Sequence, residues 1–281
     1  MPAGGAGNGV ELIFRPDPGV YDGRFANNPW LQELPRPLTK LTWDNALMLS
    51  PATARQLGVE QEQVVEVSAG GRQVKAPVWI QLGHADGAAT LHLGYGRWKS
   101  GRVASGIGTN ATLLRTHDAP WTRVGVTVTA TAETYQLAST QMHSNIPLET
   151  TEAGKRHLLR VADLATYTAH PEAIHEMAEQ VEAITLYPPD HVNTGYSWGM
   201  VVDLNACTGC NACVLACQSE NNIPVVGKEQ VRKGREMHWL RIDRYYKGDL
   251  DNPEAYHQPI VCMQCENAPC ETVCPVAATT H

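Results

Sequence analysis

The sequence lacks cysteine over most of its length: in a chain of 281 residues, all eight cysteines lie between Cys207 and Cys274. A disulfide framework is usually spread through a short secreted chain, so this distribution argues against one. The sequence also lacks a basic excess, because 22 Lys and Arg residues face 29 Asp and Glu residues, for a formal charge of −7. Nucleic-acid binding needs a positively charged surface, and we therefore expect no nucleic-acid partner.

Long apolar runs are absent as well. No stretch approaches the run of about 18 apolar residues that a membrane-spanning helix requires. The first residues, MPAGGAGNGVELIF, contain neither a charged region before an apolar core nor a twin-arginine pair. We expect a chain that neither spans a membrane nor carries its own export signal, and its length suits two domains.

Residues 1–42 are rich in the turn formers Pro, Gly and Asn. This composition predicts an irregular lead that packs on the following domain through Phe14, Trp30 and Leu31. Regular patterns begin at Trp43, and we place the first domain boundary there.

Residues 43–140 combine strand patterns with one short helix. Ser50 is typical of a helix N-cap, Pro51 of the first helical position and Gly58 of a helix end. The segments QVVEVS and VKAPVWI alternate on either side of a glycine turn, which predicts a β-hairpin, and further strands are predicted at 89–93 and 124–131. One helix among several strands indicates a small β-barrel or sandwich.

Residues 141–195 predict a helical connector between the two domains. Leu158, Leu159 and Ala162 suggest a first short helix. A second, amphipathic helix is predicted before Pro188 by apolar residues at helical spacing, namely Ile174, Met177, Val181 and Ile184.

Residues 196–281 contain two groups of cysteines, and all eight are candidate metal ligands. The first group comprises Cys207, Cys210, Cys213 and Cys217, and the second comprises Cys262, Cys265, Cys270 and Cys274. The first matches the bacterial ferredoxin spacing C-x2-C-x2-C-x3-C, with Gln218 where proline is usual. Three thiolates at this spacing let one loop wrap a corner of a cluster, whereas the fourth, a helical turn further on, reaches a different cluster.

Structural zinc is the main alternative, because the pairs Cys207/Cys210 and Cys262/Cys265 match a tetrahedral site with four thiolates. Zinc would leave the other four cysteines without a role, at spacings that iron-sulfur clusters explain, and iron-sulfur ligation is therefore favoured.

Two segments that follow the first cysteine group give further predictions, one about shielding of a cluster and one about a strand. Residues 223–225, Ile-Pro-Val, are expected to shield a cluster from water. The segment GREMHWLRIDRYY predicts a strand with Met237, Trp239 and Arg241 on one side, and packing with a solvated face is favoured over a quinone or cofactor contact.

These motifs resemble parts of a known family. The segments MVVDLNACTGCNACVLACQSENNIPVVGKEQV and CMQCENAPCETVCPVAATTH resemble the opening half of the four-cluster electron-transfer subunits that accompany molybdenum oxidoreductases such as dimethyl sulfoxide and polysulfide reductases. The segment from WDNALMLSPATARQLGV to LHLGYGR resembles the last domain of molybdopterin catalytic subunits, a double-psi β-barrel. Their order in one chain, with the lead FANNPWLQELPRPLTKLTWDNA, resembles the fused iron-sulfur subunit of alternative complex III, a membrane quinol oxidoreductase.

The resemblance implies a mixed α/β, multidomain chain: a double-psi β-barrel-like domain followed by an incomplete ferredoxin-like domain. In the family, four cysteine groups pair crosswise. Cys207, Cys210 and Cys213 would then hold one cluster and Cys262, Cys265 and Cys270 another, while Cys217 and Cys274 would each serve a cluster built partly elsewhere. The chain would be a fragment or split product whose partner segment supplies the missing thiols.

Two alternatives stay open at this point. In the first, the two groups complete each other, with Cys274 joining the first cluster and Cys217 the second, in a self-contained carrier. In the second, the chain belongs to an enzyme with bound molybdopterin, for which residues 83–87 and Asn110 are the candidate positions and loop structure the simpler interpretation. The alternative complex III resemblance implies no molybdopterin.

The implied function is one-electron relay within a quinol-oxidising membrane complex, with no bond-making catalytic residue in this chain. The implied cofactors are 4Fe-4S clusters, with one 3Fe-4S cluster in the complete subunit as an open alternative. The implied partners are a membrane-embedded quinol-binding subunit, haem c subunits and the remaining part of the fused subunit. The implied location is the outer, periplasmic face of the cytoplasmic membrane.

Overall fold

The computed structural model describes residues 9–141, 159–177, 194–196, 199–265 and 268–275. The chain divides into two compact units, one formed by Met1–Ser144 with Leu204–Val261 and the other by Asn145–Asp203 with Cys262–His281. The first unit therefore contains both the predicted barrel and the first cysteine group. The domain boundaries expected from the sequence stay a prediction.

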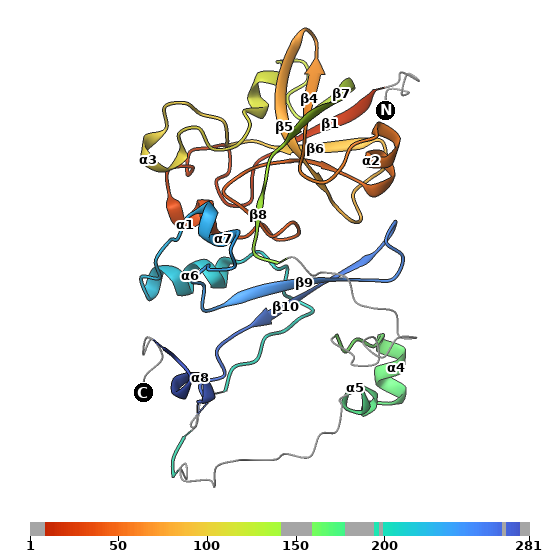
Figure 1. The fold of residues 1–281 in the computed structure, drawn as a ribbon. Coiled ribbons are helices and arrows are strands. Elements are labelled where there is room, and N and C mark those ends of the chain that lie inside the picture. The colour runs from red at the N-terminus through yellow and green to blue at the C-terminus, as the bar shows by residue number, and fades with distance from the viewer. Residues whose placement is uncertain (1–8, 142–158, 178–193, 197–198, 266–267, 276–281) are drawn as a thin grey trace. The chain divides into compact units, whose positions relative to one another are not determined.

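Six strands of the first unit close into a barrel (Figure 1). Around the barrel they run in the order β1 (Val10–Arg15), β6 (Ala88–His92), β3 (Leu47–Leu49), β5 (Arg72–Ile80), β4 (Gln63–Ala69) and β7 (Thr122–Thr134), and β7 pairs again with β1. The β1–β6 and β3–β5 pairs are parallel, and the other pairs are antiparallel. The predicted barrel, the hairpin and the strands near 89–93 and 124–131 are thereby confirmed.

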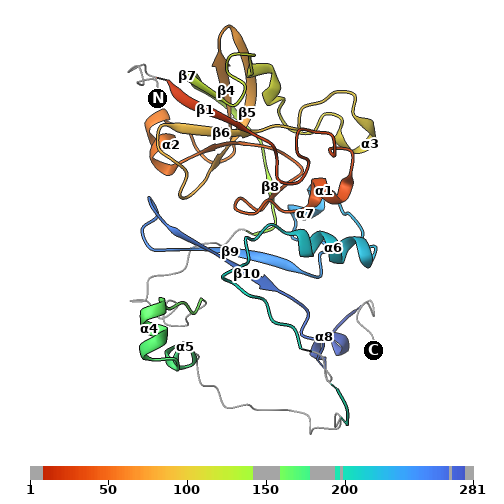
Figure 2. The ribbon, with the colours of Figure 1, turned by 180° about the vertical axis from the view of Figure 1, so that it is seen from behind.

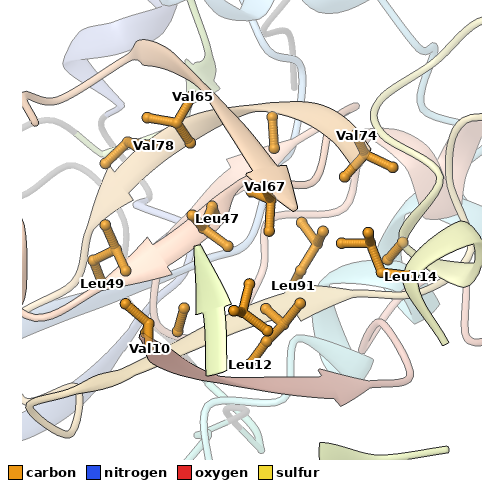
Figure 3. Packing of buried hydrophobic residues seen from close by; sticks show 14 of the residues in the cluster. Val10, Leu12, Leu47, Leu49, Val65, Val67, Val74, Val78, Leu91 and Leu114 are labelled. Carbon is orange, nitrogen blue, oxygen red and sulfur yellow. The ribbon is translucent and has the colours of Figure 1, made fainter. Parts of the chain in front are cut away.

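The barrel core follows from apolar alternation along the strands. On β4, Val65 and Val67 are fully buried and Glu66 between them is half-buried. Figure 3 shows the side chains that neighbouring strands add to this core, among them Leu12, Leu47, Leu49, Val78 and Leu91. Because burying a Val or Leu side chain contributes about 1.5–3 kcal/mol, this cluster is the main source of barrel stability.

Helix α2 (Pro51–Leu57) forms as the sequence predicts. The Ser50 hydroxyl accepts a hydrogen bond from the Thr53 amide at 3.0 Å, which satisfies a free donor of the first turn. Gly58 then adopts a φ of 64°, which glycine reaches without a steric penalty, and the helix ends there.

Residues 83–87 and Asn110 take part in loop and turn contacts. His84 Nε2 lies 2.9 Å from the Thr90 hydroxyl, and the Asp86 carboxylate accepts a hydrogen bond from Ser50. The Asn110 side chain caps the short 3-10 helix η1 (Ala111–Leu114). These contacts fit the loop interpretation of both segments.

The start of the chain differs from the predicted irregular lead. Val10–Arg15 form strand β1, in which Val10, Leu12 and Phe14 alternate into the core. The Pro, Gly and Asn residues of the lead as a whole outweighed this short apolar alternation in the sequence prediction. The remainder of the lead holds helix α1 (Pro29–Glu33) and strand β2 (Leu41–Thr42), which pairs with β8 (Ala138–Ser139), and helix α3 (Gly101–Ala104) follows the barrel strand β6.

Residues 204–261 add helices α6 (Ala212–Glu220) and α7 (Lys228–Val231) to the first unit, followed by strands β9 (Arg241–Lys247) and β10 (Glu254–Ile260). Both views place α6 and α7 beside α1 (Figure 1 and Figure 2). The predicted strand through Met237 and Trp239 is wrong at its start, since β9 begins at Arg241. The antiparallel ladder ends where Arg241 pairs with Ile260, so the residues before Arg241 have no strand partner.

The second unit contains short helices among its described residues: α4 (Leu164–Ala169), α5 (Ala173–Glu176) and α8 (Pro269–Thr272). The helix predicted at Leu159 and Ala162 is wrong, since both residues are irregular. The helix begins only at Leu164, where Asp163 caps α4 by accepting from the Thr166 amide at 2.7 Å. Leu158, Val181 and Ile184 lie outside the described residues. In the part of the chain that the structure describes, no helix is long and apolar enough to cross a membrane.

Candidate metal centre

The first cysteine group spans a tight turn and the start of a helix. Gly209 and Asn211 adopt positive φ values of 66° and 63°, which turn the chain between Cys207 and α6. Cys213 and Cys217 lie one helical turn apart on α6. Cys207 and Cys217 are half-buried, Cys210 and Cys213 are exposed, and all four are free thiols.

The second cysteine group lies in the second unit. Cys262 and Cys265 belong to irregular chain, with Gln264 between them at a φ of 50°. Cys270 lies in α8, and Cys274 follows that helix. Among the residues that the structure describes, no three His, Cys, Asp or Glu side chains converge in the manner of a preformed metal site.

The first cysteine loop is packed between the lead and strand β10. Asn211, which is buried, donates a hydrogen bond from Nδ2 to the Pro35 carbonyl at 2.7 Å. On the other side, a Cβ added at Gly209 would overlap the His257 imidazole. Glycine is therefore required here for two reasons: the positive φ and the close approach of the ring.

A buried carboxylate anchors the segment that follows α6. Glu33 of α1 is fully buried and accepts hydrogen bonds from the Val226 and Gly227 amides at 3.0 and 2.7 Å. It also accepts from the Trp43 indole at 3.1 Å. Three donors thus satisfy this buried carboxylate, and they hold residues 226 and 227 against the lead.

The apolar segment 223–225 is only partly covered. Ile223 is buried and its carbonyl accepts from the Trp30 indole at 3.2 Å, whereas Pro224 is exposed and Val225 half-buried. The first of these residues thus packs against the lead. Shielding of a cluster by this segment stays a prediction.

Three polar atoms near the cysteine loop are buried and have no hydrogen-bond partner among the described residues: Lys40 Nζ, Arg244 Nε and His257 Nδ1. Burial and the nearby Arg244 lower the pKa of Lys40 to about 8, although Asp243 and Cys207 act to raise it. Burial, with the charges of Lys40 and Arg244, also lowers the pKa of His257. A buried ammonium without a hydrogen-bond partner, in the field of Cys207, suits a group that brings acceptor sulfurs and negative charge, as an iron-sulfur cluster does.

Sequence reasoning missed Glu33, Lys40 and His257. They lie far along the chain from Cys207, on α1, at the end of the lead and on β10. No local spacing links any of them to the cysteine motif, so a single sequence contains no signal for this arrangement.

Comparison with known proteins agrees with the cysteine motifs. Residues 206–278 match the family model of the 4Fe-4S dicluster domain. The iron-sulfur cluster-binding subunit of menaquinone reductase from Nitratidesulfovibrio vulgaris is 42% identical over 83 residues, which is 29% of this chain and 32% of that protein. The B subunit of polysulfide reductase from Wolinella succinogenes is 38% identical over 87 residues, covering 29% and 39%.

A third relative extends the match somewhat. The Hdr-like menaquinol oxidoreductase iron-sulfur subunit 1 from Archaeoglobus fulgidus is 30% identical over 120 residues, which is 37% of this chain and 43% of that protein. The matched segment of this chain thus spans between 32% and 43% of these relatives.

These matches settle the class of the cysteine-rich segment. It is a 4Fe-4S dicluster domain, and the cofactors of this chain are 4Fe-4S clusters. The prediction of iron-sulfur clusters in preference to structural zinc is confirmed. The relatives are iron-sulfur subunits of oxidoreductases, including two whose names specify menaquinone or menaquinol.

Proposed function

We propose that this chain relays single electrons as the iron-sulfur subunit of a membrane-bound quinol oxidoreductase. The observation that carries the proposal is the cysteine loop of residues 207–217, whose ferredoxin spacing lies in the segment that matches the dicluster domain. The relatives named for menaquinone and menaquinol support a quinol as the electron source.

In this proposal all eight cysteines are cluster ligands: Cys207, Cys210, Cys213, Cys217, Cys262, Cys265, Cys270 and Cys274. When bound, each 4Fe-4S cluster accepts and releases one electron. The chain supplies the thiolates, orients them through the Gly209 turn and helix α6, and limits water at the half-buried Cys207 and Cys217. No side chain of this chain is assigned a bond-making role.

The finer proposal is an alternative complex III-like subunit. A closed barrel and the first cysteine group lie in one compact unit of one chain, which suits a fused subunit. The barrel is then of the double-psi type and serves as a docking platform without molybdopterin. The proposed partners are a membrane-embedded quinol-binding subunit, haem c subunits and the remaining part of the fused subunit, at the periplasmic face of the membrane.

The second candidate is a self-contained two-cluster carrier. The match to a dicluster domain includes both cysteine groups, from 206 to 278, which favours mutual completion of two clusters. Iron and sulfide analysis separates the two candidates. The chain reconstituted alone should hold about eight irons if it is a carrier, and clearly fewer if other segments complete its clusters.

The ligation proposal is tested by Cys217→Ser in the complex purified through a tag on this chain. Electron paramagnetic resonance should show the loss or alteration of one cluster signal, because serine replaces one thiolate. The control is Ser219→Ala, an exposed position on the same helix α6, which leaves every thiol in place. Unchanged spectra in Cys217→Ser would remove Cys217 from the ligand set, and a complex without iron would refute the proposed function.

A further inference from the structure

The end of the lead is fixed against the first cysteine loop by hydrogen bonds. Asn211, between Cys210 and Cys213, donates to the Pro35 carbonyl, and Arg244 of β9 donates to the Leu38 carbonyl. The backbone of Lys40 is held on both sides, since its amide donates to Arg36 and its carbonyl accepts from Thr140 at 3.0 Å. The position of Lys40 beside this loop is therefore determined by the fold.

The Lys40 side chain is buried without a described partner. Only 1% of the residue is exposed, and its Nζ forms neither a hydrogen bond nor an ion pair with any described residue. Arg244 is 4% exposed, and its Nε likewise has no hydrogen-bond partner among the described residues. Arg244 donates through Nη1 to the Leu38 carbonyl and the Tyr246 hydroxyl, whereas the Lys40 ammonium has no such partner among the described residues. Burying a charge without a partner is unfavourable, so the Lys40 ammonium calls for a negative group in the same place.

The described acidic groups do not supply that negative charge in full. Asp243 attracts the Lys40 ammonium, but its carboxylate is already bound to Arg241 at 3.0 Å and accepts a weaker hydrogen bond from Tyr245. The other group that attracts Lys40 is Cys207, the first thiol of the cysteine loop. The unpaired ammonium thus lies in the field of a proposed cluster ligand.

We propose that the Lys40 ammonium is the buried counter-charge of the 4Fe-4S cluster held by the Cys207 loop, and that it raises the reduction potential of that cluster. This inference rests on the proposed function, since it assumes that the loop holds a cluster. Four thiolates give the bound cluster a net negative charge, and adding one electron increases that charge. A fixed cation nearby stabilises the reduced form more than the oxidised form, so reduction becomes easier.

The test is a redox titration of the complex purified through this chain, followed by electron paramagnetic resonance near pH 7. Lys40→Met removes the charge with little change in volume, and methionine replaces lysine at the same positive φ. We expect one midpoint potential to become more negative by about 59 mV. This shift corresponds to about a tenfold smaller equilibrium constant for one-electron reduction of that cluster. The potentials of the other clusters should stay unchanged.

Three further variants complete the design. Lys40→Gln keeps a hydrogen-bond donor without the charge and should shift the same potential in the same direction. Lys40→Arg keeps the charge and should leave the potential near that of the wild type. Lys99→Met makes the same substitution at an exposed position and should change no potential.

Each outcome separates the Lys40 proposal from the proposed function. Cluster signals with unchanged or more positive potentials in both neutral variants would refute the role of Lys40 and leave the proposed function intact. Loss of one cluster in both neutral variants, with retention in Lys40→Arg, would support the counter-charge. Loss in all three variants would refute it, because charge would then not be the property that matters. A wild-type complex without cluster signals would refute the proposed function itself.

Discussion

His92 ends strand β6 next to a deeply buried ion pair between Arg36 and Asp17 of the lead. Arg36 Nε contacts the Asp17 carboxylate at 2.8 Å, and His92 Nδ1 lies 3.8 Å from the same carboxylate. Burial acts to raise the pKa of Asp17, but Arg36 and His92 hold it below its usual value. Burial lowers the pKa of His92, and Arg36 and Arg15 add to this against the attraction of Asp17.

These shifts predict a loss of stability in acid. Where the folded pKa of a histidine lies below its unfolded value of about 6.5, the unfolded chain binds a proton that the folded chain does not, so the free energy of unfolding falls as the pH drops below that value. The depressed pKa of Asp17 acts in the same sense at lower pH. Urea unfolding of the chain between about pH 7.5 and about pH 5.5 should reveal the decline.

Substitution of His92 tests how much this histidine contributes to the loss of stability in acid. His92→Gln should flatten the decline, since glutamine does not titrate, whereas His117→Gln, at an exposed position, should leave it as in the wild type. Equal slopes for wild type and His92→Gln would contradict the assignment.

At the scale of elements, the cysteine loop depends on Gly209 in a way that the end of helix α2 does not depend on Gly58. Gly209 and Gly58 share nearly the same backbone conformation, with φ values of 66° and 64°. An added Cβ at Gly58 meets nothing within 4 Å, whereas at Gly209 it overlaps His257. A comparison of alanine substitutions at the two positions therefore separates the cost of backbone strain from the cost of steric overlap.

We predict that Gly58→Ala costs about 1–2 kcal/mol of stability, the penalty of a left-handed alanine, and leaves the iron content unchanged. Gly209→Ala adds the overlap with His257, so it should cost more and lower the iron bound per chain. Thermal unfolding and iron analysis of the two variants measure these effects. Equal iron content in both would show that the loop tolerates a side chain at this position.

At the scale of the whole molecule, the barrel and the first cysteine group form one compact unit. Leu34 of the lead packs with Val214 of α6 and Ile242 of β9 in a small apolar cluster. Lys228 of α7 adds an ion pair to Asp44 at 2.6 Å. Because strand β1 of the lead belongs to the barrel and Leu34 packs on α6 and β9, the lead contributes to both parts of the unit.

Glu33→Gln tests this connection directly. The substitution keeps the shape but turns one carboxylate oxygen into a donor that faces other donors, so we expect a loss of about 1–3 kcal/mol in the free energy of unfolding. Urea unfolding followed by tryptophan fluorescence measures it, since Trp43 bonds to this carboxylate. Glu229→Gln, whose side chain is 68% exposed, should change stability by less than about 0.5 kcal/mol. Equal effects at both positions would argue against the anchor.

Local patterns determined much of what the sequence predicted. The cap at Ser50, the stop at Gly58 and the alternation of β4 and β5 depend on neighbours within a few residues, and these elements formed as expected. The cysteine spacing likewise depends only on the reach of one loop, so the sequence alone pointed to 4Fe-4S clusters. Strand β1 was missed because the Pro, Gly and Asn residues that follow it dominate the composition of the lead and favour an irregular segment.

Only the tertiary structure decided what surrounds the cysteine loop. Lys40, Glu33 and His257 reach the loop and the segment that follows it from three separate elements, and no pattern of period or spacing joins them to Cys207. The physical reason is the distance along the chain over which each feature is determined. Covalent geometry fixes the placement of thiols within one loop. The buried charges and donors around them depend on which distant segments the fold brings together. The sequence therefore indicated 4Fe-4S clusters, whereas packing determines which charges and hydrogen-bond donors surround the first cysteine loop.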